Sequence, residues 1–209
     1  MAKFRSGTGR TARALALAAV LICSTGPTSQ AAVAPVPVVD TFDHTLLNVM
    51  KNAEKLGYQG RYDLLSPSIE RTFNVRLMTQ LIVGLAWTGW TEMQRDQVTE
   101  AFRRFITATY ARRFDGWSGE DFVIDGDRPA ANGTIVMTRL TRPKDPPVTI
   151  NYLVRNNESG TPQVVDVYLT GTISELATRR SEFGAVLERE GYTGLLAALD
   201  KKATGLATD

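Results

Sequence analysis

His44 is the only histidine in the chain and the first candidate for acid–base chemistry. It follows Asp43 near the start of a predicted helix, where solvent-exposed histidines are common. A nucleophilic site would need a serine or cysteine brought to it. The nearest serine motif, Gly116-Trp117-Ser118-Gly119-Glu120, has Glu where a nucleophile elbow needs its second glycine. We therefore predict no catalytic residue and no enzymatic activity.

Metal and cofactor sites have few candidate residues. Asp121, Asp125 and Asp127 alternate on a predicted strand and its turn, and carboxylates of this kind bind calcium. A solvated turn explains the same three residues better. Neither a Gly-rich phosphate loop nor a dinucleotide-binding fingerprint is found in the sequence. We expect no metal and no cofactor.

Residues 1–31 have the pattern of a cleaved secretory signal peptide. Four basic residues and no acidic one lead into an apolar stretch over 14–22, and Ser29-Gln30-Ala31 offers small side chains at a cleavage site. The apolar stretch is about nine residues long, against the ~20 that a membrane-spanning helix needs. A lipoprotein signal has a small residue directly before its cysteine, but Ile22 precedes Cys23 in this sequence. We therefore expect Cys23 to be removed with the leader.

Removal of the leader changes the charge of the chain. The mature protein keeps 20 basic residues against 22 acidic ones, a net charge of about −2, and has no cysteine. No polybasic stripe remains, so we expect no nucleic-acid partner. Residues 32–39 contain Pro35 and Pro37 and are predicted to be an extended leader, followed by a single domain over 40–209.

The first half of this domain is predicted to be helical. Residues 40–56 have apolar side chains on one face and Gly57 as a stop signal. Residues 62–87 are also helical but interrupted at Ser66-Pro67, and residues 77–87 are apolar nearly all round. Because this stretch is too short to span a membrane, we expect it to be buried on more than one side. Thr91 and Gln94 have the spacing of a capping box, and the helix that follows is amphipathic with an aromatic stripe.

The second half changes to a period of two and then returns to helix. Short alternating segments over 122–125, 134–140, 148–155 and 165–169 are joined by polar turns, one of them at Asn132-Gly133. Such segments predict an antiparallel meander of about four to five strands. Thr172 and Glu175 suggest a second capping box, and Gly191 is expected to end the helix that it starts. The fold class is α+β, with the sheet packed against helices from both ends of the domain.

Three stretches together resemble the MlaC family of periplasmic lipid-binding proteins, also called toluene-tolerance proteins. They lie in the same order as in the family and span roughly 42–202. The stretches are Thr91-Glu92-Met93-Gln94 with Phe102-Arg103-Arg104-Phe105 and Tyr110; Val165-Asp166-Val167-Tyr168-Leu169 with Gly171-Thr172-Ile173-Ser174; and Arg179-Arg180-Ser181-Glu182-Phe183 with Leu187, Gly191 and Leu195-Leu196-Ala197-Ala198-Leu199. The last stretch looks especially like HpnM, the branch associated with hopanoid biosynthesis.

The resemblance implies a non-enzymatic periplasmic carrier that holds a phospholipid or hopanoid in a slot between sheet and helices. Its partners would be an inner-membrane ABC-type lipid transporter complex and an outer-membrane lipoprotein complex. We expect the slot to be lined by Leu81, Ile82, Leu85, Phe102, Phe105, Ile106, Tyr110, Val165, Val167 and Leu169. Periodicity cannot distinguish a slot from a closed core. A periplasmic scaffold or adaptor with a tight core therefore remains the alternative.

Overall fold

The structure, a computed structural model, describes residues 34–208. Its helices are α1 (Pro35–Lys51), α2 (Ala53–Thr72), α3 (Val75–Val83), the 3-10 helix η1 (Gly84–Gly89), α4 (Glu92–Arg113) and α5 (Glu175–Thr208). Its strands are β1 (Asp121–Ala130), β2 (Gly133–Thr141), β3 (Val148–Asn156), β4 (Pro162–Leu169) and β5 (Ile173–Ser174). This order confirms the predicted α+β class. The predicted signal peptide and Cys23 lie outside the described residues.

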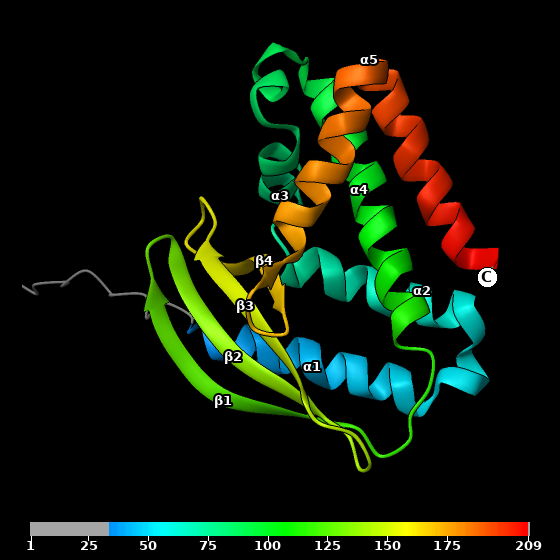
Figure 1. Cartoon of the computed structure of the whole chain (residues 1–209), viewed down its shortest axis with the longest axis vertical. Helices are drawn as coiled ribbons and strands as arrows, with labels where there is room; N and C mark the ends of the chain where they lie inside the picture. The colour runs from blue at the N-terminus through cyan, green and yellow to red at the C-terminus, as the bar shows by residue number, and fades with distance from the viewer. Residues whose placement is uncertain (1–33, 209) are drawn as a thin grey trace, which may run out of the picture. The chain divides into compact units, whose positions relative to one another are not determined.

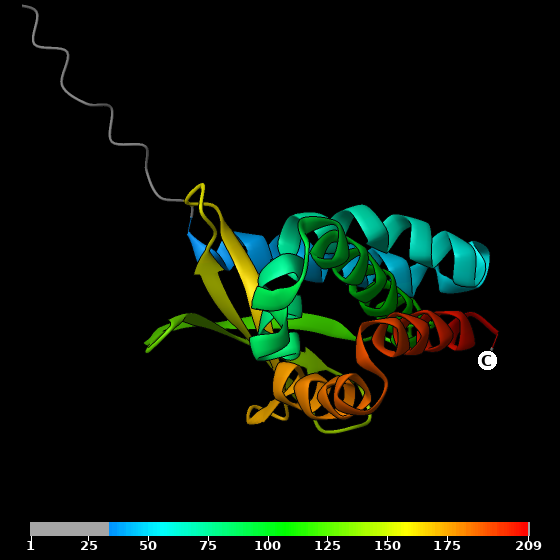
Figure 2. The same cartoon turned by 90° about the horizontal axis from the view of Figure 1, so that it is seen from above.

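The five strands form one antiparallel sheet in the order in which they follow one another in the chain. Helix α1 packs along the sheet and contacts β1 to β4, and α2, α3 and α5 contact β4 (Figures 1 and 2). The predicted meander is confirmed. No helix among residues 34–208 combines the length and the apolar character needed to cross a membrane.

A β-bulge in β4 changes which of its residues face the helices. Val154 of β3 pairs with Val164, but Tyr152 pairs with Val167, so Val165 is the extra residue between the two pairs. Val164 and Val167 consequently belong to the main core. The extra residue breaks the alternation of side chains on which a simple strand pattern depends.

The start of the domain differs from the predicted extended leader, because α1 already begins at Pro35. A proline fits the first turn of a helix, because backbone N–H groups there have no acceptor within the helix and the one that proline lacks is not needed. Val39 is fully buried in the core, which holds this first turn in place.

Helix α2 continues through Pro67, so the predicted break at Ser66-Pro67 is wrong. Leu65 and Ile69 on either side of the proline are fully buried, and their packing outweighs the lost backbone hydrogen bond. The irregular position in α2 is Gly57, whose φ of 60° and ψ of −176° depart from a helix. Arg61, which is buried, donates to the carbonyl oxygens of Ala53 (3.2 Å) and of Ala111 at the end of α4 (2.9 Å).

The apolar segment 77–87 is not one helix. Helix α3 ends before Gly84, whose φ of 65° is a left-handed conformation that favours glycine, and η1 follows. Leu85 in η1 is 91% exposed, while Ile82 and Trp87 are buried. The expectation that this whole segment is buried is therefore wrong at Leu85 and at the exposed Ala86.

The capping signals give mixed results. The capping box at Thr91 and Gln94 is confirmed, with both hydrogen bonds formed at the start of α4. Gly191 interrupts α5 with a φ of 67°, as predicted. At the start of α5, however, the hydroxyl of Ser174 rather than Thr172 accepts a backbone hydrogen bond, from Ala177 at 2.9 Å. The capping box predicted at Thr172 is therefore wrong, because residues 173–174 pair with β4 as the short strand β5.

Candidate functional site

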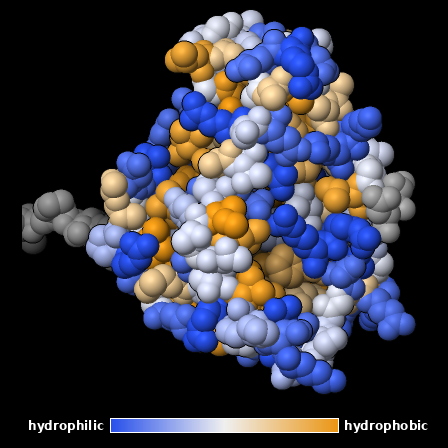
Figure 3. Space-filling view, viewed as in Figure 1, coloured by the Kyte–Doolittle hydropathy of each residue, from blue (hydrophilic) through white to orange (hydrophobic). Residues whose placement is uncertain are grey.

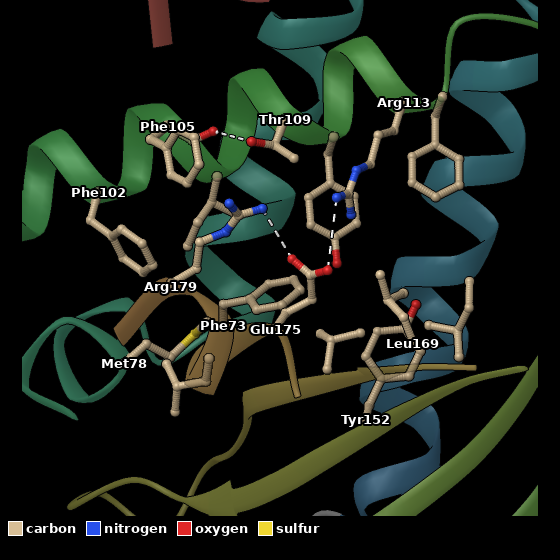
Figure 4. Close-up of a pocket in the computed structure, with 16 residues that line it drawn as sticks. Phe73, Met78, Phe102, Phe105, Thr109, Arg113, Tyr152, Leu169, Glu175 and Arg179 are labelled. Carbon is tan, nitrogen blue, oxygen red and sulfur yellow. Dashed lines mark hydrogen bonds and ion pairs between the residues drawn. The ribbon is translucent and has the colours of Figure 1, made fainter. Parts of the chain in front are cut away.

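A cavity of about 290 Å³ lies between the sheet and α4, close to the start of α5 (Figure 4). Most of its wall is apolar or aromatic. The lining residues are Phe73, Met78, Phe102, Phe105, Ile106, Thr109, Tyr110, Arg113, Phe114, Ile150, Tyr152, Val167, Leu169, Glu175, Leu176 and Arg179. Apolar side chains are visible among hydrophilic ones at the centre of the face in Figure 3. The protein thus keeps apolar surface around an open space instead of closing it into a packed core.

Aromatic rings form one wall of the cavity. Phe73 and Tyr110 meet edge to face with a centroid separation of 5.8 Å, and both contact Phe42, at 5.1 and 5.3 Å. Tyr110 also stacks on Phe114 at 5.7 Å. These rings come from α1, α4 and the end of α2. Such contacts stabilise each pair beyond its buried area and leave the rings little freedom to collapse into the space.

A buried carboxyl lies behind this wall. Asp43 on α1 is 2% exposed and accepts a hydrogen bond of 3.0 Å from the hydroxyl of Tyr152, whose ring lines the cavity. The second carboxyl oxygen of Asp43 has no hydrogen-bond partner among the described residues. Burial raises the pKa of this carboxyl from its ordinary 3.8 to about 7, and the hydrogen bond from Tyr152 opposes the rise.

Charged side chains gather at one end of the cavity. Glu175, in the first turn of α5, lies between two guanidinium groups: Arg179 at 3.1 Å and Arg113 of α4 at 3.8 Å (Figure 4). Arg179 also pairs with Glu182 at 2.9 Å, and its guanidinium lies 5.1 Å from the ring centroid of Phe105. The cavity is therefore amphipathic, with an apolar body and a charged end.

The start of α5 is fixed by a second buried carboxylate, Asp166 on β4. One oxygen of Asp166 accepts from the backbone N–H of Leu176 (3.0 Å), and the other accepts from the hydroxyl of Ser174 (2.6 Å). Both bonds tie the first turn of α5 to the sheet. They set the position from which Glu175, Leu176 and Arg179 reach the cavity.

Six of the ten residues expected to line a slot do line this cavity: Phe102, Phe105, Ile106, Tyr110, Val167 and Leu169. The other four lie outside the lining. Leu85 is exposed because the chain turns at Gly84, and Val165 is the extra residue of the β-bulge. Ile82 is buried in the core, and Leu81 of the same helix is partly exposed.

Sequence reasoning missed lining residues of two kinds. Ile150 and Tyr152 alternate on β3, and Arg113 and Phe114 continue the stripe of α4 by one more turn, so period alone could have found them. Phe73, Met78, Glu175, Leu176 and Arg179 come from segments that only the tertiary fold brings to the cavity.

The residues considered for chemistry lie apart from the cavity. His44 is exposed, and its ring nitrogen contacts the backbone oxygen of Asp40 at 2.8 Å. Asp125 forms two hydrogen bonds of 2.6 Å with the guanidinium of Arg139 across the sheet. Among residues 34–208, no three His, Cys, Asp or Glu side chains are grouped so that they could hold a metal ion.

The fold and the cavity define a helix-and-meander domain built around an internal amphipathic space. Comparison with known protein families identifies the family to which this domain belongs. The model of the MlaC protein family matches residues 40–201, and the chain belongs to this family.

A solved structure shares the same fold. It is a phospholipid-binding protein from Ralstonia solanacearum in complex with a phospholipid, and it superposes with a TM-score of 0.73 at 22% sequence identity. The match covers 84% of this chain and 100% of the Ralstonia chain.

Proposed function

We propose that this protein is a non-enzymatic carrier that holds the apolar tail of a membrane lipid in the cavity between sheet and helices. The cavity itself is the main support for this proposal, because it has an aromatic and aliphatic body and a charged end at Arg113, Glu175 and Arg179. Membership of the MlaC family supports lipid binding and a location in the periplasm. The bound phospholipid of the Ralstonia protein supports a phospholipid as cargo, and a hopanoid is the second candidate.

An apolar cavity that stays open favours a carrier over a scaffold. Its volume of about 290 Å³ is just below the ~300–1,000 Å³ typical of small-molecule sites. A scaffold with a closed core would gain stability by filling this space, because an empty cavity costs packing contacts. A space kept open among apolar side chains is expected when an apolar ligand occupies it.

Energetics favour transfer by docking. Each buried methylene is worth ~0.8 kcal/mol against water, so release of a whole acyl chain into water is slow. A membrane offers the lipid the same apolar environment, and a docked partner that opens the cavity therefore avoids exposing the tail. On this basis we propose that the protein shuttles lipid between an inner-membrane ABC-type transporter complex and an outer-membrane lipoprotein complex.

Extraction of the purified protein with organic solvent, followed by lipid mass spectrometry, tests the proposal. We expect about one lipid per chain in the wild type. Val167→Trp fills the cavity and should remove most of that lipid, since Val167 lines it. Val123→Trp is the matched control on β1, where the native valine is 37% exposed, and it should keep the lipid. A wild-type protein purified from its periplasm without lipid, or equal lipid in both variants, would contradict a carrier role for this cavity.

A further inference from the structure

A buried carboxyl is connected to the cavity through a single side chain. Asp43 on α1 is 2% exposed, and one of its oxygens accepts a hydrogen bond of 3.0 Å from the hydroxyl of Tyr152. Its other oxygen has no hydrogen-bond partner among residues 34–208. The ring of Tyr152 lines the cavity from the side of the sheet (Figure 4). A ligand that fills the cavity therefore lies against the side chain that holds this carboxyl.

The surroundings of Asp43 compensate its charge only weakly. Burial has the largest effect and raises the pKa of its carboxyl to about 7. The hydrogen bond from Tyr152 lowers this pKa, Asp40 on the same helix raises it, and His44 lowers it. On α4, the hydroxyl of Tyr110 interacts with Asp43 but carries no charge near neutral pH, because burial raises its own pKa.

The other elements packed against α1 add no counter-charge to Asp43. These elements are α2, β1, β2 and β4, and within the described part of the chain none of their side chains forms an ion pair or a hydrogen bond with Asp43. The ionised carboxyl thus has one hydrogen bond and no ion pair. A buried charge in this situation is costly, so the surroundings favour the neutral form.

A lipid tail in the cavity changes the polarity around this carboxyl. Arg113 lines the cavity and its side chain is 49% exposed, so the space opens to solvent at its charged end. Without lipid, water that enters this space helps to solvate Tyr152 and Asp43. An apolar tail takes the place of that water. The ionised form of Asp43 then becomes still less favourable, while the neutral form is affected much less.

We propose that lipid binding in the cavity is coupled to protonation of Asp43, so that the protein holds its lipid tightly while this carboxyl is neutral and more loosely once it is ionised. This inference rests on the proposed function and adds its regulation by pH. The coupling is reciprocal, because a lipid that favours the protonated carboxyl is itself bound more tightly by the protonated protein.

The direction and the pH range of the effect follow from linkage. The pKa of Asp43 is about 7 without lipid and is higher with lipid bound, so binding takes up a proton between these two values. Affinity is then constant below about pH 6, falls as the pH rises through 7, and levels off above the pKa of the lipid-bound state. A tenfold loss of affinity corresponds to a lipid that raises this pKa by about one pH unit.

Calorimetric titration of the lipid-free protein with a short-chain phosphatidylcholine tests the coupling, because this lipid keeps the same charge from pH 6 to pH 9. We expect the wild type to bind about tenfold more weakly at pH 9 than at pH 6. Asp43→Asn keeps an oxygen that accepts the hydrogen bond from Tyr152 but cannot ionise. It should bind at both pH values about as tightly as the wild type does at pH 6. His44→Gln, on the same helix with an exposed side chain, is the matched control and should keep the difference.

Two further measurements separate proton coupling from a purely structural role of Asp43. Titration in buffers of different ionisation enthalpy counts the protons taken up on binding. Near pH 7.5 we expect about half a proton for the wild type and none for Asp43→Asn. Tyr152→Phe removes the hydrogen bond that lowers the pKa of Asp43, so it should move the fall in affinity to higher pH.

Each contrary outcome has its own meaning. The same pH dependence in the wild type and Asp43→Asn, or no proton uptake by the wild type, would overturn the coupling while the carrier function stands. A fall in affinity that moves to lower pH in Tyr152→Phe would overturn it as well. Failure of the wild type to bind the lipid at any pH would refute the proposed function and this inference with it. Circular dichroism spectra at each pH establish that the proteins are folded, and proton uptake by the wild type tests the coupling without any variant.

Discussion

Asp43 gives this protein a pH-dependent stability whose sign and size follow from its surroundings. The carboxyl is buried behind the aromatic wall, with one hydrogen bond from Tyr152 and one oxygen without a partner among residues 34–208. Asp40, Tyr110 and His44 also lie near enough to interact with its charge. Burial has the largest effect and raises the pKa of Asp43 in the folded protein from 3.8 to about 7.

A raised carboxyl pKa means that the folded state binds the proton more tightly than the unfolded state. Between pH 4 and pH 7 the unfolded state has lost this proton while the folded state keeps it, so the free energy of unfolding falls as pH rises. One proton changes stability by about 1.36 kcal/mol per pH unit, and a shift of about three units gives roughly 4 kcal/mol in total. The contribution is largest below pH 4 and is lost by about pH 7 to 8.

Asp43→Asn removes the titration and keeps an oxygen that accepts the hydrogen bond from Tyr152. We expect the variant to match the wild type near pH 4 and to be more stable by up to roughly 4 kcal/mol at pH 8, where the wild type must bury a charge. Urea denaturation of the lipid-free proteins at four pH values measures this difference. His44→Gln is the control on the same helix, because its side chain is exposed and its replacement should leave most of the pH dependence in place. A stability difference between Asp43→Asn and the wild type that does not change with pH would refute the reasoning.

Three other predictions test the cavity, a buried cation and processing. Val167→Glu should stay folded and lose lipid, because its carboxylate can face a cavity that fills with water. Thermal unfolding and lipid extraction on the same sample measure both effects. If Val167 instead lay in a closed core, the variant would lose several kcal/mol of stability. Arg61→Met should lower the free energy of unfolding, measured by urea denaturation, by ~2–3 kcal/mol, because two buried carbonyl oxygens lose a charged donor. A decrease of less than about 0.5 kcal/mol would show that water replaces the guanidinium as the donor. Intact-mass measurement of periplasmic protein should show cleavage near Ala31, and an acylated Cys23 in the product would contradict this.

Local signals in the sequence predicted the elements whose formation depends on neighbouring residues. The capping box of Thr91 and Gln94 and the break at Gly191 act within one helical turn, so spacing alone reveals them. The alternation in 148–155 depends only on which side of a strand each residue faces, and β3 has the predicted bounds within one residue. The order of helices and strands then led to the α+β class.

Local signals failed where packing between distant segments was decisive. Pro67 breaks an isolated helix, yet buried Leu65 and Ile69 hold α2 together across it. Residues 35–39 favour an extended chain by composition, but burial of Val39 draws them into α1. The bulge at Val165 arises from pairing with β3 and leaves no mark in the sequence of β4 itself.

The sequence by itself determined that the chain has apolar stripes to bury and few residues suited to catalysis. Its stripe on α4 and its pattern on β4 supplied six of the cavity residues, because helix and strand periods assign each side chain to a face. Only the tertiary structure decided that those faces stand apart instead of closing on each other. The Phe73–Tyr110 contact and the Arg113–Glu175 ion pair join residues tens of positions apart. No local period encodes such distances, because they are set by how α2, α4 and α5 pack against one sheet.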